Sequence, residues 1–285
     1  PAVIWLLCFH YLPIFGLQVA FKDFNYRDGI LSSPWNGLEN FKFFFTSNDA
    51  FRLIRNTIGY NLLWLVLCNL LAGMLVAILL YEVRGRFANR LYQTSMLIPS
   101  FVSYVIIAYI ANLLLNPASG MFNQLMESMG MEGINWYNEP KYWPFILTAF
   151  DIWRNVGMAS LYYYAALLSI DPCLYEAASL DGASRFRQIW HISIPELMPM
   201  ACIVLITKLG GVLGGSMDIF YQLPMNSGAL YPATDVISTY TYRGLTTGTI
   251  GPTAAVGLFQ SVVGLVLLLG ANALIRKISP KNAMF

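Results

Sequence analysis

Glu176-Ala177-Ala178, Gly182 and Ile192-Ser193-Ile194-Pro195 lie in a short polar stretch of an otherwise very apolar chain. Two small residues follow the acid, the glycine comes six residues after that acid, and the Ile-x-Ile-Pro stop begins ten residues after the glycine. A lipid-embedded segment would not carry this composition, because polar groups are costly in a membrane. We interpret the stretch as a protruding helix–turn–helix that docks onto a partner protein.

The composition of the whole chain indicates a membrane protein. Of the 285 residues, 57% are hydrophobic and 11% are charged, whereas a globular domain carries about 25% charged residues. The charged residues also cluster between long apolar runs. We predict an all-α, multi-pass membrane protein with a single transmembrane domain over residues 1–285. The net charge of +2 is small and spread out, so it gives no indication of a nucleic-acid partner.

The cysteines do not suggest a metal or redox site. None of them has the spacing of a metal-binding or redox pair. Three fall in apolar runs, where cysteine behaves as a small hydrophobic residue. The four are Cys8, Cys68, Cys173 and Cys202. We therefore predict no metal site in this chain.

Six stretches are apolar enough to cross a membrane, because a spanning helix needs about 20 mostly apolar residues. We predict helices over residues 1–21, 57–81, 91–115, 143–168, 197–219 and 251–275. The chain begins at Pro1, next to an apolar run and without a methionine. We expect a cytoplasmic N-terminal piece to precede it, not a cleaved signal peptide.

The basic residues predict the orientation, because short cytoplasmic loops are enriched in lysine and arginine. The loops after the second and fourth predicted spans and the C-terminus lie on one side, which we take as cytoplasmic together with both termini. Their basic residues are Arg84, Arg86, Arg90, Arg185, Arg187, Arg276, Lys277 and Lys281. The first outer loop opposes the rule, although it also holds four acids. Its basic residues are Lys22, Arg27, Lys42, Arg52 and Arg55.

Local signals predict two short helices within about residues 169–196. Asp171-Pro172 is a helix start, because aspartate caps helices and proline suits their first turn. Asp181-Gly182 supplies the turn, since glycine tolerates positive φ. Pro195 would then restart the chain toward the fifth span.

The second of these helices, over about residues 184–193, is expected to be amphipathic. Phe186, Ile189 and Trp190 fall at helical spacing and form an apolar face. Arg185 offers charge pairing at its rim. The plainer alternative is an amphipathic helix that lies on the lipid surface.

The spacing of this stretch resembles the EAA loop of ABC importer permeases, which reads Glu-Ala-Ala, three residues, Gly, nine residues and Ile-x-Leu-Pro. This chain matches at Glu176, Ala177, Ala178, Gly182, Ile192 and Pro195. It has Ile194 where leucine is usual. The resemblance extends over essentially the whole chain and is closest to the oligosaccharide or polysaccharide branch of the maltose-type sugar permeases. Less specific similarities to that branch are Leu97-Ile98-Pro99, Asp171-Pro172 and residues 235–245.

The resemblance implies a type I ABC importer permease of the bacterial cytoplasmic membrane, with about six transmembrane helices. It implies that the loop docks in a cleft of a dimeric cytoplasmic ATPase, which binds ATP and Mg²⁺ and whose closure swings the helices between inward- and outward-open states. It also implies a second, homologous permease and an extracellular or periplasmic solute-binding protein. The residues expected to couple to the ATPase are Glu176, Ala177, Ala178, Gly182, Arg185, Ile192 and Pro195.

The sequence carries no nucleotide-binding motif of its own. It lacks Gly-x-x-x-x-Gly-Lys-Ser/Thr, and Gly244, Gly248 and Gly251 have no lysine beside them. The motifs His-Glu-x-x-His and Gly-x-Ser-x-Gly of enzymes are also missing. We predict a protein that is not an enzyme and holds no cofactor, with ATP hydrolysis in a partner.

Ionisable residues within spans are costly unless they face a cavity or a partner. Asp151 and Arg154 are three residues apart and therefore share a helix face. Either they neutralise each other, or they line the translocation path with Asn155, Met158 and Tyr162.

Lys208 lies in the middle of the fifth predicted span, with no acid at helical spacing. We therefore favour a position facing a cavity for this side chain. The glycines that follow permit close helix packing or a break in the helix. They are Gly210, Gly211, Gly214 and Gly215.

An oligosaccharide is the expected substrate, bound by aromatic stacking and hydrogen bonds. The side chains available are Tyr104, Asn112, Asn155, Tyr162, Tyr163 and Tyr164. Arg154 and Lys208 would also suit an acidic sugar such as a uronide, because guanidinium pairs well with carboxylate. Two alternatives stay open: an ion-coupled secondary transporter with Asp151 as its coupling site, and an ABC permease for another polar solute such as a glycerol phosphate.

Overall fold

The computed structural model describes residues 1–278, and the regular structure in this range is helical. The first half of the chain forms α1 (Ala2–Leu6), η1 (Leu7–Tyr11), η2 (Leu12–Phe21), α2 (Gly29–Ser32), α3 (Glu39–Thr46), α4 (Asn48–Trp64), η3 (Leu65–Ala72), α5 (Gly73–Glu82), α6 (Arg86–Phe101), α7 (Tyr104–Leu115) and α8 (Met121–Ser128). The second half forms η4 (Trp136–Asn138), η5 (Pro140–Tyr142), α9 (Trp143–Leu168), α10 (Pro172–Leu180), α11 (Arg185–Gln188), η6 (Ile189–Ser193), α12 (Ile194–Gly210), α13 (Met217–Gln222), η7 (Gly228–Leu230), α14 (Tyr231–Thr234), α15 (Ile237–Thr247) and α16 (Ile250–Ile278).

Each of the six predicted spans contains helix, although the third and the fifth are interrupted and not every span is long and apolar enough to cross a membrane. Within residues 1–278, four helices are long and apolar enough to cross a membrane. They are Ala2–Phe21, Asp49–Glu82, Arg185–Gly210 and Ile250–Ala273. The pair α6 and α7 makes a fifth if it is counted as one bent span. α9 extends over 26 residues but falls outside this set, because Asp151, Arg154 and Asn155 make its middle polar.

The third predicted span is not one continuous helix, so the expectation for residues 91–115 is corrected. α6 ends at Phe101 and α7 leaves at an angle of 94°. Val102 is extended, and the Ser103 side chain accepts a hydrogen bond from the Ile106 N–H at 3.4 Å. Ser103 thereby caps a new helix, and this was the signal available in the sequence.

The fifth span is also corrected at both ends. It begins at Arg185 and ends at Gly210, so the stop expected at Pro195 is wrong. A π-helical turn precedes this proline, and there the Ile194 N–H donates to the Ile189 carbonyl five residues earlier. Pro195 therefore lies inside a continuous helix, directly after a π-helical turn that already interrupts the regular i→i−4 hydrogen bonding. Beyond Gly210 the chain turns before α13 begins, which is one of the two outcomes that the glycine cluster permits.

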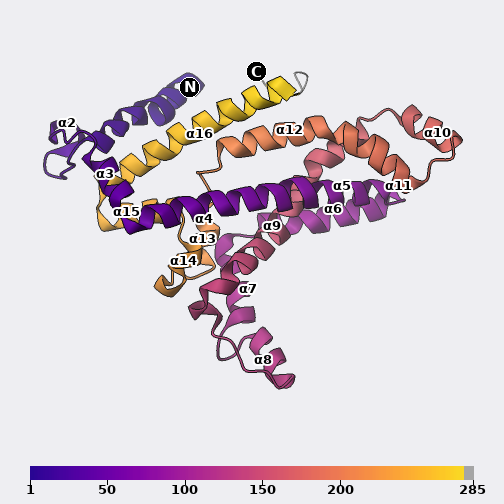
Figure 1. The fold of residues 1–285 in the computed structure, drawn as a ribbon, viewed down its shortest axis with the longest axis horizontal. Helices are drawn as coiled ribbons and strands as arrows, with labels where there is room; N and C mark the ends of the chain where they lie inside the picture. The colour runs from indigo at the N-terminus through magenta and orange to yellow at the C-terminus, as the bar shows by residue number, and fades with distance from the viewer. Residues whose placement is uncertain (279–285) are drawn as a thin grey trace.

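Many loops lie at two opposite ends of the molecule, and α7, α8 and α14 project away from both ends, at the bottom of Figure 1. Figure 1 shows the α5–α6 turn with α10 and α11 at one end, and α2, α3 and α15 at the opposite end. We call the first the inner end and the second the outer end, after the charge rule that predicts a cytoplasmic position for the first. Lys281, which contributed to that prediction, lies outside the described residues.

The basic residues of the first outer loop are largely compensated. The Lys22 ammonium donates to two backbone carbonyls at 2.8 Å. Arg52 pairs with Asp49 and Asp235 at 3.0 Å, and Lys42 lies 3.6 Å from an acid of its own helix. These three of the five basic residues thus have carbonyl or carboxylate partners at the end that the charge rule predicts to be outer.

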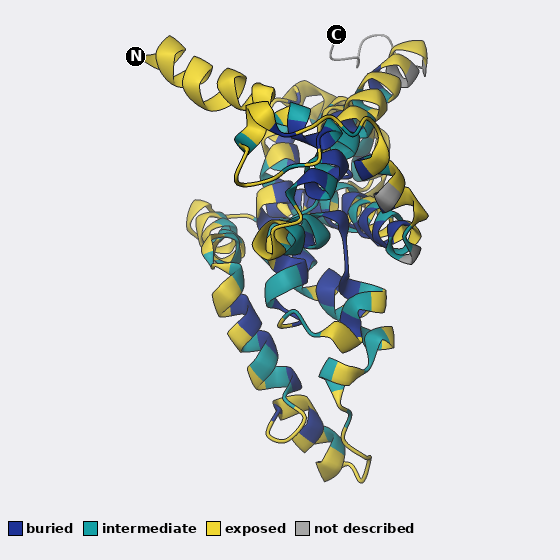
Figure 2. Ribbon diagram, turned by 90° about the vertical axis from the view of Figure 1, so that its left-hand side faces the viewer, coloured by how far each residue is buried: buried dark blue, intermediate teal, exposed yellow. Residues whose placement is uncertain are grey.

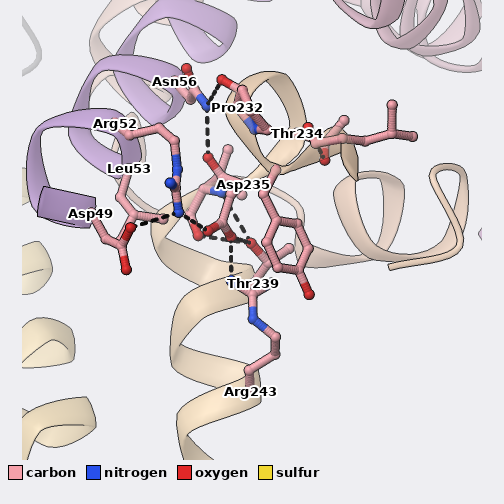
Figure 3. Close-up of polar contacts among 12 residues, drawn as sticks. Asp49, Arg52, Leu53, Asn56, Pro232, Thr234, Asp235, Thr239 and Arg243 are labelled. Atoms are coloured by element: carbon pink, nitrogen blue, oxygen red, sulfur yellow. Dashed lines mark hydrogen bonds and ion pairs between the residues drawn. The ribbon is translucent and has the colours of Figure 1, made fainter. Parts of the chain in front are cut away.

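Asp235 is the centre of the polar network at the outer end (Figure 3). Its carboxylate accepts from Arg52 of α4 and from Arg243 of α15. It also accepts from the Thr239 hydroxyl at 2.8 Å, and its backbone carbonyl accepts from the Asn56 amide at 3.0 Å. The network fastens the turn between α14 and α15 to α4.

The hydrophobic core lies where the long helices cross. Figure 2 shows buried residues in the middle of the molecule, whereas the N-terminal helix is exposed along most of its length. At the inner end, Ala77 of α5 packs with Tyr163 and Leu167 of α9 and with Leu197 of α12. This cluster anchors the helices that lead into the α10–α11 loop.

Candidate coupling loop and translocation cavity

The loop after α9 forms the predicted first helix and turn, but the predicted second helix over about residues 184–193 is the first part of the continuous helix Arg185–Gly210. Asp171 lies at the N-cap of α10 and accepts a hydrogen bond from the Cys173 N–H at 2.9 Å, with Pro172 in the first turn. α10 ends at Leu180, and Gly182 follows with a φ of +74°. The predicted cap and turn are both confirmed.

Hydrogen bonds connect α10, the turn after it and α11. The Gly182 N–H donates to the Ser179 carbonyl at 3.1 Å, and the Ala183 N–H donates to the Ala178 carbonyl at 2.9 Å. The buried Gln188 amide donates to the Ser179 hydroxyl at 2.9 Å and to the Ala183 carbonyl at 3.2 Å. The loop therefore presents a preorganised surface.

The predicted apolar face of the second helix divides into two parts. Ile189 is half-buried and packs against the inner core cluster. Phe186 and Trp190 are 75% and 61% exposed, and their rings stack with centroids 6.3 Å apart. They line a surface groove together with Arg187 and His191. An exposed aromatic surface next to polar residues is typical of a site that binds a protein or a membrane surface.

The residues expected to couple to an ATPase differ in their accessibility. The exposed ones are Glu176, Ala177, Gly182, Arg185 and Pro195. Ala178 and Ile192 are partly buried, and Ile192 packs against the same cluster as Ile189. Their role in coupling stays a prediction.

A polar cavity of about 400 Å³ lies among α4, η3, α7, α9 and α12. Four of the five residues predicted for the substrate path line it: Asp151, Asn155, Tyr162 and Lys208. Arg154 does not belong to the lining. The lining also contains Asn61, Asn69 and Thr207, which were not expected from the sequence. For the two asparagines the available signal was an amide side chain inside an apolar span.

Asp151 and Arg154 form no ion pair in the described part of the chain, so the idea that they neutralise each other directly is wrong. Asp151 is buried, and its carboxylate accepts from the Asn155 amide at 2.7 Å. The Arg154 guanidinium donates to the Asn155 carbonyl oxygen at 3.1 Å, to the Val102 carbonyl at 3.3 Å and to the Tyr104 hydroxyl at 3.3 Å. Asn155 therefore stands between the two charges.

Lys208 lies in the last turn of α12 and not in the middle of a helix, which corrects the expected position. A lysine suits this place because helix C-termini favour cations. The side chain lines the cavity and makes no hydrogen bond or ion pair with any residue of the described range 1–278. Gly211 and Gly215, from the helix break, line the same cavity.

The comparison with protein families decides the class of protein. The family described as "Binding-protein-dependent transport system inner membrane component" matches residues 69–280. The chain belongs to this family. The matched region contains the α10–α11 loop, Asp151 and Lys208. The permease is thus an inner membrane component of a transport system, and ion-driven transport is not favoured.

Curated relatives and solved structures agree with the family. The permease is 37% identical to the polygalacturonan/rhamnogalacturonan transport system permease protein YteP and 35% identical to Protein LplB, both of Bacillus subtilis. Each match covers 97% of this chain and 86% of the relative. A solved bacterial ABC transporter for import of the acidic polysaccharide alginate has a chain with 34% identity and a TM-score of 0.89. That match covers 98% of this chain and 93% of the solved chain. A second structure, in complex with alginate pentasaccharide-bound periplasmic protein, gives 33% identity and a TM-score of 0.88, with coverage of 98% and 92%.

Proposed function

We propose that this permease moves an acidic oligosaccharide across the inner membrane, driven by ATP hydrolysis in a partner subunit. The observation that carries the proposal is the position of Lys208 in the polar cavity. The Asp151 carboxylate in the same cavity accepts a hydrogen bond from Asn155. The Lys208 ammonium is attracted by the Asp151 charge, but it has no hydrogen-bonding partner within the described residues. A carboxylate on the substrate would supply that partner.

The remaining lining suits a sugar. Tyr104 and Tyr162 offer aromatic surfaces, and Asn61 and Asn69 offer amide groups that donate and accept hydrogen bonds. Two relatives are named for acidic polymers, polygalacturonan/rhamnogalacturonan and alginate. These names support a uronate-containing substrate for this chain.

The hydrogen-bonded α10–α11 loop and its exposed aromatic pair support a partner protein at the inner end. We infer that Phe186 and Trp190 enter a cleft of a dimeric cytoplasmic ATPase, which binds ATP and Mg²⁺. A second, homologous permease would complete the transmembrane path. An extracellular or periplasmic solute-binding protein would deliver the oligosaccharide, and one of the solved structures resembling this chain is described with such a protein.

The test is to purify the chain co-expressed with its operon neighbours. ATP hydrolysis is then measured with and without the cognate binding protein and with oligogalacturonate, a neutral oligosaccharide or a glycerol phosphate. We expect an ATPase and a second permease to co-purify, and we expect hydrolysis to rise most with binding protein loaded with oligogalacturonate. A chain that purifies alone and moves solute on an ion gradient would contradict the proposal. Stimulation by glycerol phosphate alone would contradict the sugar assignment.

A further inference from the structure

Arg154 lies at the break in the third span, outside the lining of the cavity. α6 ends at Phe101, and α7 leaves at 94° from Tyr104. Between them the Arg154 Nε donates to the Val102 carbonyl at 3.3 Å. A helix that ends within a bilayer leaves carbonyl groups without partners, which is costly there. Arg154 supplies a donor to one such carbonyl.

The same guanidinium holds Tyr104 in two ways. Its central carbon lies 4.1 Å from the centroid of the Tyr104 ring, and its Nη1 donates to the tyrosine hydroxyl at 3.3 Å. Tyr104 is the first residue of α7 and lines the cavity. A planar guanidinium can stack on the ring and donate at its edge together, whereas a lysine ammonium cannot reproduce both contacts. The contact therefore fixes one wall of the cavity.

A close approach of α9 to α6 completes the arrangement. A Cβ atom at Gly157, one turn after Arg154, would collide with the Met96 carbonyl. Asn155 links Arg154 to Asp151 through hydrogen bonds of 3.1 and 2.7 Å. A continuous chain of contacts thus runs from the buried carboxylate in the cavity to the break in the neighbouring span.

We propose that Arg154 is a positioning residue that braces the break between α6 and α7 and holds Tyr104 in the cavity wall without contacting the substrate. The substrate part of this inference rests on the function proposed above. Removal of such a positioning residue should lower transport of neutral and acidic oligosaccharides alike. A residue that pairs with the substrate carboxylate would affect acidic oligosaccharides much more than neutral ones.

The experiment uses the complete transporter with Arg154→Gln, Arg154→Lys, Tyr104→Leu and the double variant Arg154→Gln/Tyr104→Leu. Spin labels at the exposed positions Tyr92 and Leu113, one on each side of the break, report the α6–α7 distance after removal of the exposed cysteines. Half-saturating concentrations are measured for neutral and acidic oligosaccharides of equal length. Lys208→Gln, which leaves the break intact, is the comparison variant.

We expect Arg154→Gln to broaden the distance distribution and to weaken transport of both substrates by at least about tenfold, because small misplacements of binding groups have large effects. Arg154→Lys should recover part of both properties. The double variant should lose little more than the worse single variant, since both act through one contact. An unchanged distance distribution in Arg154→Gln, with or without a loss confined to acidic substrates, would overturn the inference. If the unaltered complex moves no oligosaccharide, the proposed function fails, but the distance measurement still tests the brace.

Discussion

Asp235 and Arg52 lie 183 positions apart in the sequence, and their side chains form an ion pair with an N···O distance of 3.0 Å. The Asp235 side chain is 2% exposed and also accepts from Arg243 (Figure 3). The pair joins α4 to the turn that leads into α15. One buried carboxylate therefore connects α4 and α15, which are distant in the sequence, at the outer end of the molecule.

Replacement of this carboxylate should destabilise the outer end. In Asp235→Asn the two guanidinium groups lose their shared counter-charge, and breaking a buried pair of this kind costs about 3 kcal/mol. We expect a lower apparent melting temperature of the purified complex. Glu39→Gln is the control, because its pair with Lys42 is 66% and 68% exposed and contributes less than about 1 kcal/mol. Equal melting temperatures for the two variants would contradict the structural role of Asp235.

The α10–α11 loop could be predicted from sequence because its signals are local. Asp171-Pro172 starts α10, Gly182 supplies positive φ, and Ser184 caps α11, all within 14 positions of one another. Each choice is decided by backbone preferences and short-range hydrogen bonds. The long apolar runs likewise predicted where helices occur, though not where they end.

The features that sequence reasoning missed depend on contacts between distant residues. Arg154 meets the Val102 carbonyl across 52 positions, and Asp235 meets Arg52 across a larger separation. No periodicity or spacing in one sequence encodes such pairs. The same limit explains why Arg154 was expected in the cavity. Arg154 lies on the same helix as the lining residue Asp151, but its N–H groups donate to Val102 and Tyr104 at the neighbouring break.

Gly182 should be sensitive to substitution for two reasons. Its φ is positive, and a side chain there would collide with the surface of the proposed partner ATPase. A Cβ atom there would meet nothing within 4 Å in this chain, although its φ is +74°. We expect Gly182→Asp to leave insertion intact and to uncouple ATP hydrolysis from transport. Gly130→Asp is a matched control, since Gly130 has a φ of +76°, equally open surroundings and a place in the loop after α8. If both variants transport normally, or if both fail alike, Gly182 has no special part in coupling.

The stacked pair Phe186 and Trp190 should dominate association with the ATPase. Exposed aromatic residues that become buried at an interface often contribute about 2 kcal/mol or more each. We expect the Phe186→Ala/Trp190→Ala variant to lose most of the co-purifying ATPase while keeping its melting temperature, since the rings are largely exposed in this chain. Met129→Ala, at a 65% exposed position of the segment after α8, should retain the ATPase. Full retention of the ATPase by the double variant would rule out this contact.

Lys208 should determine preference for substrate charge. Loss of a hydrogen bond to a charged group costs about 1.5–3 kcal/mol, so Lys208→Gln should raise the half-saturating concentration of an oligogalacturonate by about tenfold or more. A neutral oligosaccharide of equal length should be affected much less, and Lys208→Arg should restore most of the preference. Thr207→Val is the control in the same cavity, because its hydroxyl is already bound to the carbonyls of Ile203 and Val204. Equal losses for the two sugars in Lys208→Gln would remove charge pairing from the mechanism.

Gly264 should be required for the packing of α16 against α12. A Cβ atom at this position would lie 2.7 Å from the Gly210 carbonyl oxygen, and backbone cannot move aside as a flexible side chain can. A Cβ atom at Gly210 would in turn lie 2.6 Å from the Leu268 Cδ1 atom of α16. Small residues at such crossings let membrane helices approach closely. We expect Gly264→Ala to lower the melting temperature of the complex, with an overpacking cost of about 1–3 kcal/mol.

Gly270 provides the matched control for this prediction. It lies on the same helix, and a Cβ atom there would meet nothing within 4 Å. Gly270→Ala should be neutral or stabilising, because alanine favours a helix over glycine by about 1 kcal/mol. A lower melting temperature in Gly264→Ala alone would assign the effect to the α12–α16 contact. That contact lies within two residues of Lys208, so the same variant should also alter the preference for acidic over neutral substrates. An unchanged preference in a destabilised Gly264→Ala complex would separate helix packing from the geometry of the cavity.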